Sequence, residues 1–342
     1  MRHAEAPIGD DKIVMSTAKN RLNDVATVPA SAIVPTRDRA NALARALRSL
    51  GEQGALPAEL IVVDASCDDS TRKVMSTFAA QVQAQGCRVL WEPAMQSGAA
   101  AQRNQGARLA TQPVICFFDD DILFGSDCLA RLWSALQSDP RLGGVNAMIT
   151  NQLYRPPRPV SRWMFRMMAG RAQESYAGRV LGPAVNLLPE DRSDLPDVVP
   201  VEWLNLGCTL YRREALPDPI FAGHFTGYSL MEDLTLSLAV GKRWKLANVR
   251  TARIYHDSRP GAHKDEPVAR SRMELVNRHH VMTQVLSRRR PADYARLALW
   301  ECFQLAICAI QKRAGLAFWR VLQGKVLGLH DILVNRPTRA AG

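Results

Sequence analysis

The sequence predicts an α/β fold in which a mostly parallel sheet carries helices on both faces, with a helical extension at the C-terminus. Two observations indicate this class. In the first half of the chain, short apolar runs alternate with amphipathic stretches, which is the pattern of buried parallel strands joined by helices. Helical patterns then dominate the last part of the chain. With 47% hydrophobic and 23% charged residues, the composition is that of a globular protein.

The predicted strands of the first half are short and mostly apolar, and they cover residues 31–35, 60–63, 88–91 and 114–118. The predicted helices carry apolar residues at three- and four-residue spacing, as Leu43, Leu47 and Leu50 do. These helices cover residues 40–50, 70–85, 99–110 and 125–136. Strand and helix therefore alternate in the order that a parallel sheet requires.

The second half breaks this alternation. Residues 152–200 are rich in Pro and Arg, which predicts a long insertion or flap. Ordered segments return at residues 201–212, 227–240 and 245–256. A polar loop at residues 259–267 and helical patterns at residues 268–334 follow them. We therefore expect a polar, disordered tail at residues 1–27, a central domain at residues 28–257 and a helical region at residues 258–342.

Positive charge is concentrated in the second half. The net charge is +11, and residues 242–290 hold thirteen Lys or Arg against four Asp or Glu. Residues 155–179 add six Arg against one Glu. Such a basic half favours an anionic partner, either a phosphate-bearing ligand, an acidic membrane surface or a nucleic acid; a solvated basic face is the alternative. Because no aromatic-basic nucleic-acid motif is present, we expect no nucleic-acid partner.

The cysteines and the apolar runs bear on the compartment. Seven cysteines are scattered, with no Cys-x-x-Cys pair, which favours reduced thiols over a disulfide framework or a zinc site. The sequence shows no apolar signal core at its N-terminus and no run of about 18 apolar residues. We therefore expect a cytoplasmic protein.

Three carboxylates, Asp119, Asp120 and Asp121, directly follow the apolar strand at 114–118. Like charges this close repel one another, so the cluster is costly unless a cation sits among them. The carboxyl end of a buried strand faces the crevice where open α/β sheets bind ligands. The cluster therefore predicts a divalent-metal site for a phosphorylated ligand, with an ordinary acidic turn as the alternative.

Asp64 ends its strand as Asp119 ends a later one, so both side chains are expected at the same rim of the sheet. Asp64 can accept a hydrogen bond from a base or ribose, or it can cap a turn. Between the two, Gly98 precedes a helix of small residues whose N-terminus favours anions. Arg103 and Asn104 on this helix are candidate ligand contacts, or else surface residues.

An acidic pair and a histidine follow downstream. Glu232 and Asp233 lie in the first turn of a predicted helix, where the helix dipole favours carboxylates. They either cap the helix or provide a general base that takes a proton from a hydroxyl. His256 ends the last predicted strand, where it can complete a metal shell near the carboxylates or play a structural part.

Taken in order over residues 30–256, seven short motifs resemble those of the family 2 inverting glycosyltransferases, which have the GT-A fold. They are VPTRDR at 34–39, VVD at 62–64 with DST at 69–71, RNQG at 103–106, FDDD at 118–121, Gly207 with RRE at 212–214, MED at 231–233 and YH at 255–256. Asp38 stands where the family usually has Asn, and Cys67 where it has Ser. The resemblance implies a Rossmann-like, mostly parallel sheet flanked by helices.

The resemblance also implies a role for each matching position. Asp233 acts as the base, and Glu232 supports it or positions the acceptor. A Mn²⁺ or Mg²⁺ ion is bound by Asp119, Asp121 and His256. A nucleotide-sugar donor, with a UDP-sugar favoured over a GDP- or dTDP-sugar, is held by Pro35, Thr36, Arg37, Asp64, Arg103, Asn104, Asp119 and Asp120. Residues 28–150 then form the donor-binding half and residues 151–257 the acceptor-side half.

The implied reaction is direct displacement at the anomeric carbon with inversion, onto a hydroxyl of a glycan or lipid-linked acceptor. Processive synthases carry a Q-x-x-R-W motif, but here Val-Gly-Lys precedes Arg243 and Trp244, so we expect addition of a single sugar. The bacterial proteins of this kind often build exopolysaccharide or lipopolysaccharide. This implies polysaccharide biosynthesis for the cell envelope, at the cytoplasmic face of the inner membrane.

The helices predicted at 268–334 combine Trp and Phe with flanking basic residues, such as 288–290 and 312–313. This composition suits a helix pair lying on an anionic membrane. Packing against the catalytic domain or against a dimer mate is the alternative.

Other classes share parts of this pattern. A haloacid-dehalogenase-like phosphatase also places Asp-x-Asp after an apolar strand, but there the motif ends the first strand, whereas three predicted strands precede that of Asp119. A nucleotidyltransferase would carry a Gly-rich loop after its first strand, which residues 35–38 do not form. A non-catalytic carbohydrate- or nucleic-acid-binding protein is the alternative from a different class, because the basic half suits an anionic ligand.

Overall fold

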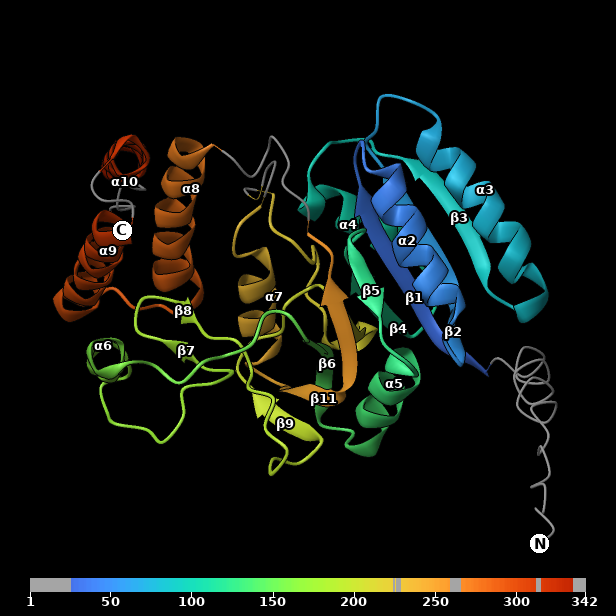
Figure 1. The fold of residues 1–342 in the computed structure, drawn as a ribbon, viewed down its shortest axis with the longest axis horizontal. Helices are drawn as coiled ribbons and strands as arrows, with labels where there is room; N and C mark the ends of the chain where they lie inside the picture. Colours follow the sequence, from blue (N-terminus) through green and yellow to red (C-terminus); the bar gives the residue numbers. More distant parts are fainter. Residues whose placement is uncertain (1–25, 224, 226–228, 259–265, 312–314, 335–342) are drawn as a thin grey trace, which may run out of the picture.

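The computed structural model describes residues 26–223, 225, 229–258, 266–311 and 315–334. Within these residues a nine-stranded sheet forms the centre of the molecule (Figure 1). Its order is β3 (Arg88–Pro93), β2 (Ala55–Asp64), β1 (Ala26–Thr36), β4 (Val114–Phe118), β10 (Cys208–Arg212), β6 (Leu142–Ile149), β11 (Lys245–His256) and β5 (Ile122–Phe124), with β9 (Val198–Val201) paired to β11. The tail predicted at 1–27 lies outside the described residues, except that its last two residues begin β1.

The strands that come first in the sequence form a parallel half of the sheet, as the sequence predicted. β1 pairs in parallel with β2 and β4, and β2 pairs in parallel with β3. β10 then lies antiparallel between β4 and β6, and β11 is parallel to β6 but antiparallel to β5 and β9. The sheet is therefore mixed as a whole, because helical crossovers fix the direction of the first strands and a long connection leaves that of β10 free.

Helices cover both faces of the sheet. α2 (Ala40–Gly51), α3 (Ser70–Val82) and α5 (Cys128–Ser138) pack on one face, and α4 (Ala99–Leu109) and α7 (Glu232–Val240) on the other. Strand side chains alternate between the two faces, so that Val62 packs in the first layer and Ile61 and Val63 in the second. Two apolar layers around one sheet confirm the predicted α/β class.

The 152–200 segment contains elements that its composition did not predict, a helix and a short hairpin: α6 (Pro159–Ala169), β7 (Val180–Leu181) and β8 (Val185–Asn186). Met164 and Met168 of α6 pack with Tyr176 against Trp300 in the C-terminal part of the chain. This segment therefore lies against the C-terminal helices, away from the parallel half of the sheet (Figure 1).

The C-terminal helices are α8 (Pro267–His280), α9 (Pro291–Gln311) and α10 (Leu316–Val334). A π-helical turn at Val281–Val285 extends α8, and 3-10 turns lie at Gln83–Gln85 and Arg213–Ala215. α10 packs closely on α8 at Gly324, because glycine has no Cβ. A Cβ at this position would lie only 2.4 Å from the carbonyl oxygen of Val268. None of the helices in the described residues is long and apolar enough to cross a membrane.

Candidate functional site

The carboxyl ends of the parallel strands bring the predicted donor-side residues together. Thr36 at the end of β1 is in register with Asp64 at the end of β2. Ile33 of β1 is in register with Phe117 of β4, which places Asp119 just beyond the same rim. The parallel pairing therefore confirms that Asp64 and Asp119 share one edge of the sheet.

Asp120 and Asp121 are buried and share one arginine. Arg39 Nη1 lies 2.7 Å from Asp120 Oδ1, and Arg39 Nη2 lies 2.6 Å from Asp121 Oδ2. Thr36 Oγ1 also donates to Asp120, at 2.7 Å. Burial raises the pKa of Asp120 to about 7. Burial acts in the same direction on Asp121, but hydrogen bonds from His256 and Arg39 outweigh it, and the pKa of Asp121 is below its ordinary value.

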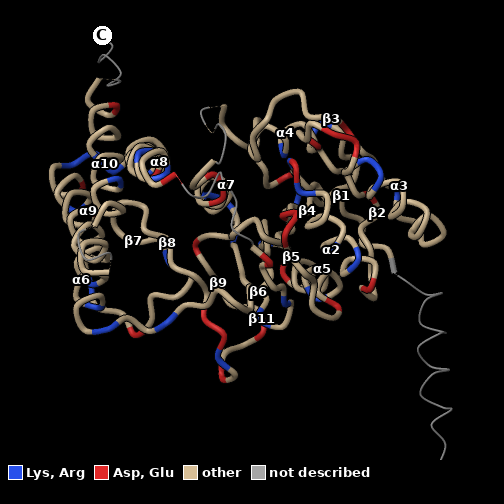
Figure 2. Tube along the Cα trace, turned by 45° about the horizontal axis from the view of Figure 1, so that its top comes forward, with Lys and Arg blue, Asp and Glu red and all other residues tan. Residues whose placement is uncertain are grey.

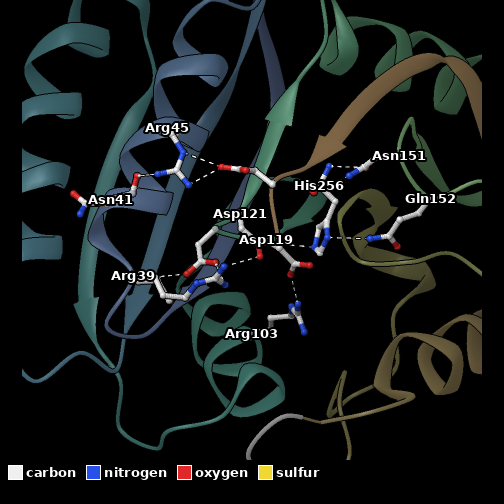
Figure 3. A network of polar contacts seen from close by, with 12 residues as sticks. Arg39, Asn41, Arg45, Arg103, Asp119, Asp121, Asn151, Gln152 and His256 are labelled. Atoms are coloured by element: carbon white, nitrogen blue, oxygen red, sulfur yellow. Dashed lines mark hydrogen bonds and ion pairs between the residues drawn. The ribbon is translucent and has the colours of Figure 1, made fainter. Parts of the chain in front are cut away.

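Asp119, Asp121 and His256 form a group that could hold a metal ion, with one ligand atom from each residue and all three atoms within 4.8 Å of one another (Figure 3). His256 Nε2 lies 3.2 Å from Asp121 Oδ1. Gln152 Nε2 lies 3.1 Å from His256 Nδ1, and Asn151 bonds to the backbone of His256. Two carboxylates and an oriented imidazole suit a divalent ion such as Mn²⁺.

Arg103 links this group to the acidic pair on α7. Its Nη2 lies 2.7 Å from Asp119 Oδ1, and its Nη1 lies 3.1 Å from Glu232 Oε1. The side chain is buried, with only 4% exposed. Its Nε has no hydrogen-bond partner among the described residues. Arg103 therefore holds two carboxylates that are more than one hundred residues apart in the sequence.

The packing of α4 explains how Arg103 reaches this place. A Cβ at Gly106 would lie 2.5 Å from Ile33 Cγ2, so only glycine lets α4 approach β1 this closely. One turn earlier, Gln102 Nε2 donates to the carbonyl oxygens of Thr36 and Val63, at 2.9 and 2.7 Å. These contacts fix α4 across the ends of β1 and β2, with Arg103 directed at the carboxylates.

Glu232 and Asp233 open α7 and are mostly buried. Met231, with a φ of 70°, turns the chain into the helix. Burial raises the pKa of both carboxyls, and the charge of Asp233 raises that of Glu232 further. Arg103 acts in the opposite direction on both. The pair therefore holds a proton more readily than exposed carboxylates do, which suits general acid–base chemistry.

The remaining predicted donor contacts differ in how far they are engaged. Asp64 accepts from Ser66 N at 2.9 Å and from Trp91 Nε1 at 3.0 Å. Arg37 is exposed, donates to Ser97 Oγ at 3.3 Å, and its Nε lies 3.5 Å from Asp38 Oδ2. Pro35 is half-buried beside Thr36 near the end of β1. Asp64 is thus buried and oriented by the protein, whereas Arg37 is held by two long contacts at the surface, where a ligand can reach it.

Asn104 is engaged by the protein itself. Its Nδ2 donates to the carbonyl oxygen of Phe221 at 2.7 Å, and its Oδ1 accepts from Phe221 N at 3.0 Å. Both polar groups of its amide thus hold the segment that precedes α7. A contact of Asn104 with the donor stays a prediction, whereas its part in anchoring Phe221 is visible.

Three residues of the site were not predicted. Arg39 stands in the first motif but shows its role only through its ion pairs, and Gln152 and Gln102 act through contacts across more than sixty residues. The only signal for Arg39 was its place in the VPTRDR motif. No local pattern marks Gln152, because the insertion that carries it gave no regular period.

Residues 31–183 match the model of a known protein family, described as Glycosyl transferase family 2. Over these residues the chain is similar to this family, in agreement with the resemblance that its motifs predicted. The matched region begins in β1 and includes Asp64, Arg103 and the three aspartates after β4. Asp233 and His256 lie beyond it.

Two curated proteins resemble part of the chain. They are validoxylamine A glucosyltransferases from Streptomyces hygroscopicus subsp. limoneus and from subsp. jinggangensis (strain 5008), each 31% identical over 107 residues. The alignments cover 31% of this chain and 23% and 25% of those proteins. The chain therefore matches about a quarter of the length of these relatives.

Two solved structures share the fold over most of the chain. The mannosyltransferase PcManGT from Pyrobaculum calidifontis, in complex with GDP-Man and Mn²⁺, has a TM-score of 0.50 at 16% identity, with 96% of this chain and 84% of that chain covered. S. aureus TarS 1-349, in complex with UDP-GlcNAc, has a TM-score of 0.55 at 16% identity, with 90% and 81% covered. These likenesses confirm a GT-A fold with C-terminal helices.

Proposed function

We propose that this protein is a metal-dependent, inverting glycosyltransferase that moves one sugar from a nucleoside-diphosphate sugar to a hydroxyl of a glycan or lipid-linked acceptor. The observation that carries the proposal is that Arg103 joins a metal-ligating group to an acidic pair, through Asp119 on one side and Glu232 on the other. The match of residues 31–183 to the family model supports sugar transfer. The GDP-Man and Mn²⁺ bound by PcManGT support the metal and the donor, and the UDP-GlcNAc bound by TarS 1-349 supports the donor.

The strand ends offer the donor a shaped and oriented place. Asp64 is held by Ser66 and Trp91, and each of its oxygens can accept one further hydrogen bond from a base or ribose. Thr36 donates to Asp120, which leaves the lone pairs of its hydroxyl for a ligand. Arg37 is exposed beside them and can bind a phosphate or ribose oxygen.

Asp119, Asp121 and His256 would hold the metal, which supplies charge neutralisation of the departing nucleoside diphosphate. The low pKa of Asp121 keeps that ligand ionised over the physiological pH range. Gln152 and Asn151 orient His256 from behind, so the histidine is positioned before any ligand arrives.

Asp233 would take the proton of the acceptor hydroxyl. Burial raises its pKa to about 6, so at neutral pH it is ionised and more basic than an exposed aspartate. Glu232 lies beside it, and Arg103 holds Glu232 in place. Direct attack by the activated hydroxyl, with departure of the diphosphate, inverts the configuration of the anomeric carbon.

A thermal-shift screen of UDP-, GDP- and dTDP-sugars with and without Mn²⁺ tests the donor, and NMR of the product's anomeric proton tests the stereochemistry. We expect one nucleoside class to stabilise the protein only with Mn²⁺, and a product with one added sugar of inverted configuration. Phosphate release from phosphomonoesters without sugar transfer would show a phosphatase instead. A retained configuration would contradict inversion, and a ladder of longer products would contradict single addition.

We also propose that the protein binds an anionic membrane surface at its periphery, on the cytoplasmic face. The support lies in exposed apolar side chains next to arginines. On α6, Val160, Trp163 and Met167 are exposed at helical spacing beside Arg162 and Arg166. Figure 2 shows basic residues along α6 and the segments near it. Trp and Leu with adjacent Arg are typical of interfacial helices.

Co-sedimentation with vesicles tests this attachment. We expect the protein to bind vesicles that contain phosphatidylglycerol and not vesicles of phosphatidylcholine alone. Trp163→Ser should weaken binding, whereas Met95→Ser should not, because Met95 is even more exposed than Trp163 but lies in the loop after β3. Equal binding of both variants would assign the apolar face of α6 to packing or to a dimer.

A further inference from the structure

A cavity of about 310 Å³ lies where the insertion meets the C-terminal helices, and arginines from four separate segments line it. Arg171 follows α6 and Arg179 precedes β7. Arg288 follows the π-helical turn, and Arg296 lies in α9. None of the described residues of the carboxylate site belongs to this lining. The fold thus gathers four guanidinium groups that are scattered over the sequence.

The lining of this cavity carries an excess of positive charge. Its four guanidinium groups face two carboxylates, those of Glu202 and Asp293, which leaves a net charge of +2. Arg179 Nη1 lies 3.1 Å from Glu202 Oε1, and Arg296 Nη1 lies 3.4 Å from Asp293 Oδ1. These two ion pairs use both carboxylates of the lining.

Two arginines have no carboxylate to neutralise them. Arg288 Nη1 donates to the carbonyl oxygen of Gly182, which orients the guanidinium group and leaves its charge in place. Arg171 is exposed at the edge of the cavity. Neither residue forms an ion pair with a carboxylate in the part of the chain that the structure describes. Guanidinium groups gathered in one hollow repel one another, so a bound anion would stabilise the arrangement.

We propose that this cavity binds a phosphate group, carried either by a small soluble molecule or by a lipid headgroup. The planar donors of arginine match phosphate oxygens in pairs, and the net charge of +2 balances the charge of about −2 on a phosphate monoester. Met168, Val180 and Leu181 form an apolar side of the cavity, against which the carbon part of the ligand can lie. The site uses none of the residues proposed for sugar transfer, so each proposal can fail without the other.

Isothermal titration calorimetry on the full chain, in buffer without divalent metal, tests the site with inorganic phosphate and glycerol 3-phosphate as probes. We expect the wild type to bind glycerol 3-phosphate, and the double variant Arg171→Gln/Arg288→Gln to bind at least about tenfold more weakly. Arg48→Gln is the matched control, because Arg48 is an exposed arginine of α2 that lies outside this lining. Mn²⁺-dependent binding of a nucleotide sugar should be the same in all three proteins.

Vesicle binding separates the two sources of the phosphate. If the source is a headgroup, the wild type should bind to vesicles with phosphatidic acid and the double variant should not, while the soluble probes bind weakly. If the source is a soluble ester, glycerol 3-phosphate should bind and the vesicles should not discriminate between the proteins. The proposal is overturned if the wild type binds neither kind of probe, or if the double variant binds as tightly as the wild type.

Discussion

Two clusters of charged side chains in this molecule differ in their balance of charge. The site cluster, at the carboxyl ends of β4 and β11, holds five carboxylates against two arginines and a histidine: Asp119, Asp120, Asp121, Glu232 and Asp233 against Arg39, Arg103 and His256. The helix cluster, between α8, α9 and α10, holds two carboxylates against two cations: Glu274 and Glu301 against Arg278 and Lys325.

The helix cluster is neutral and closed. Lys325 Nζ lies 3.0 Å from Glu274 and 2.7 Å from Glu301, and Arg278 lies 3.0 and 3.2 Å from the same two carboxylates. Burial acts to raise the pKa of Glu274, but Lys325 and Arg278 outweigh it, and the pKa is lowered. Each charge has its partners, so this cluster can hold three helices together but offers nothing to a ligand.

The site cluster has more carboxylates than the protein can neutralise. Burial raises the pKa of Asp120 to about 7 and that of Asp233 to about 6. Such a site gains free energy from a cation or a proton, and sugar transfer needs both a cation on the leaving diphosphate and a proton acceptor. The comparison therefore assigns binding and chemistry to the unbalanced cluster and stability to the balanced one.

The largest effect should come from removing a metal ligand. Asp121→Ala is expected to abolish Mn²⁺-dependent donor binding, because it deletes a buried ligand that His256 and Arg39 orient. Calorimetry with the best nucleotide sugar should show a loss of more than about 100-fold in affinity. Asp194→Ala, which removes an exposed aspartate paired with Arg192 outside the site cluster, should bind normally. Donor binding by Asp121→Ala at the wild-type affinity would show that the site cluster does not hold the metal.

The proposed base should separate chemistry from binding. Asp233→Asn keeps the size of the side chain and cannot accept the proton, so turnover should fall by roughly 10²–10⁴-fold while donor affinity stays unchanged. Steady-state kinetics and calorimetry on the same preparation measure the two effects. Normal turnover in this variant would mean that another group takes the proton.

The sequence predicted the parts of the fold that depend on local patterns. Apolar strands and amphipathic helices gave the parallel half of the sheet, and strand ends placed Asp64 and Asp119 on one rim, as the register confirms. The direction of β10 was not predictable, because it depends on a long connection. The elements of 152–200 were missed because they pack on helices that follow more than one hundred residues later.

The site was predictable at the level of motifs and not of partners. The three aspartates stood out because they follow an apolar strand. Arg39 did not, because its two ion pairs reach residues more than eighty positions away. Asn104 was assigned to the donor, yet both of its polar groups hold Phe221. Residue type and spacing show which chemistry is available, whereas only the fold shows which partner each group has.

The balanced cluster should respond in stability and not in function. Lys325→Met leaves Glu301 buried with one partner fewer, which is expected to cost about 3–5 kcal/mol of unfolding free energy. The double variant Lys325→Met/Glu301→Leu should regain most of this loss, because no unpaired charge remains. Urea unfolding measures both, with Mn²⁺-dependent donor binding as the readout that should not change. A loss of donor binding in the folded variant would join the two clusters functionally.

The pH dependence of turnover should follow the acidic pair. Asp233, with a pKa of about 6, is protonated and inactive as a base at lower pH. We expect turnover to fall about tenfold for each pH unit below about 6 and to level off above it. Donor binding measured over the same range separates this effect from protonation of the metal ligands. A profile that stays flat down to about pH 5 would exclude Asp233 as the group that limits turnover.

Stability without metal should show the opposite trend. A carboxyl with a raised folded pKa binds its proton more tightly in the folded chain, so the unfolding free energy falls as pH rises from about 4 to about 6. Glu274, with a lowered pKa, gives no slope above about pH 5, because its stabilisation is complete above its unfolded pKa and is lost only at lower pH. In urea unfolding with a chelator, the free energy of unfolding should therefore fall by about 1 kcal/mol per pH unit for each such site carboxyl. Asp233→Asn should remove the contribution of one carboxyl to that slope. An unchanged slope in Asp233→Asn would mean that the ionisation of Asp233 does not oppose folding.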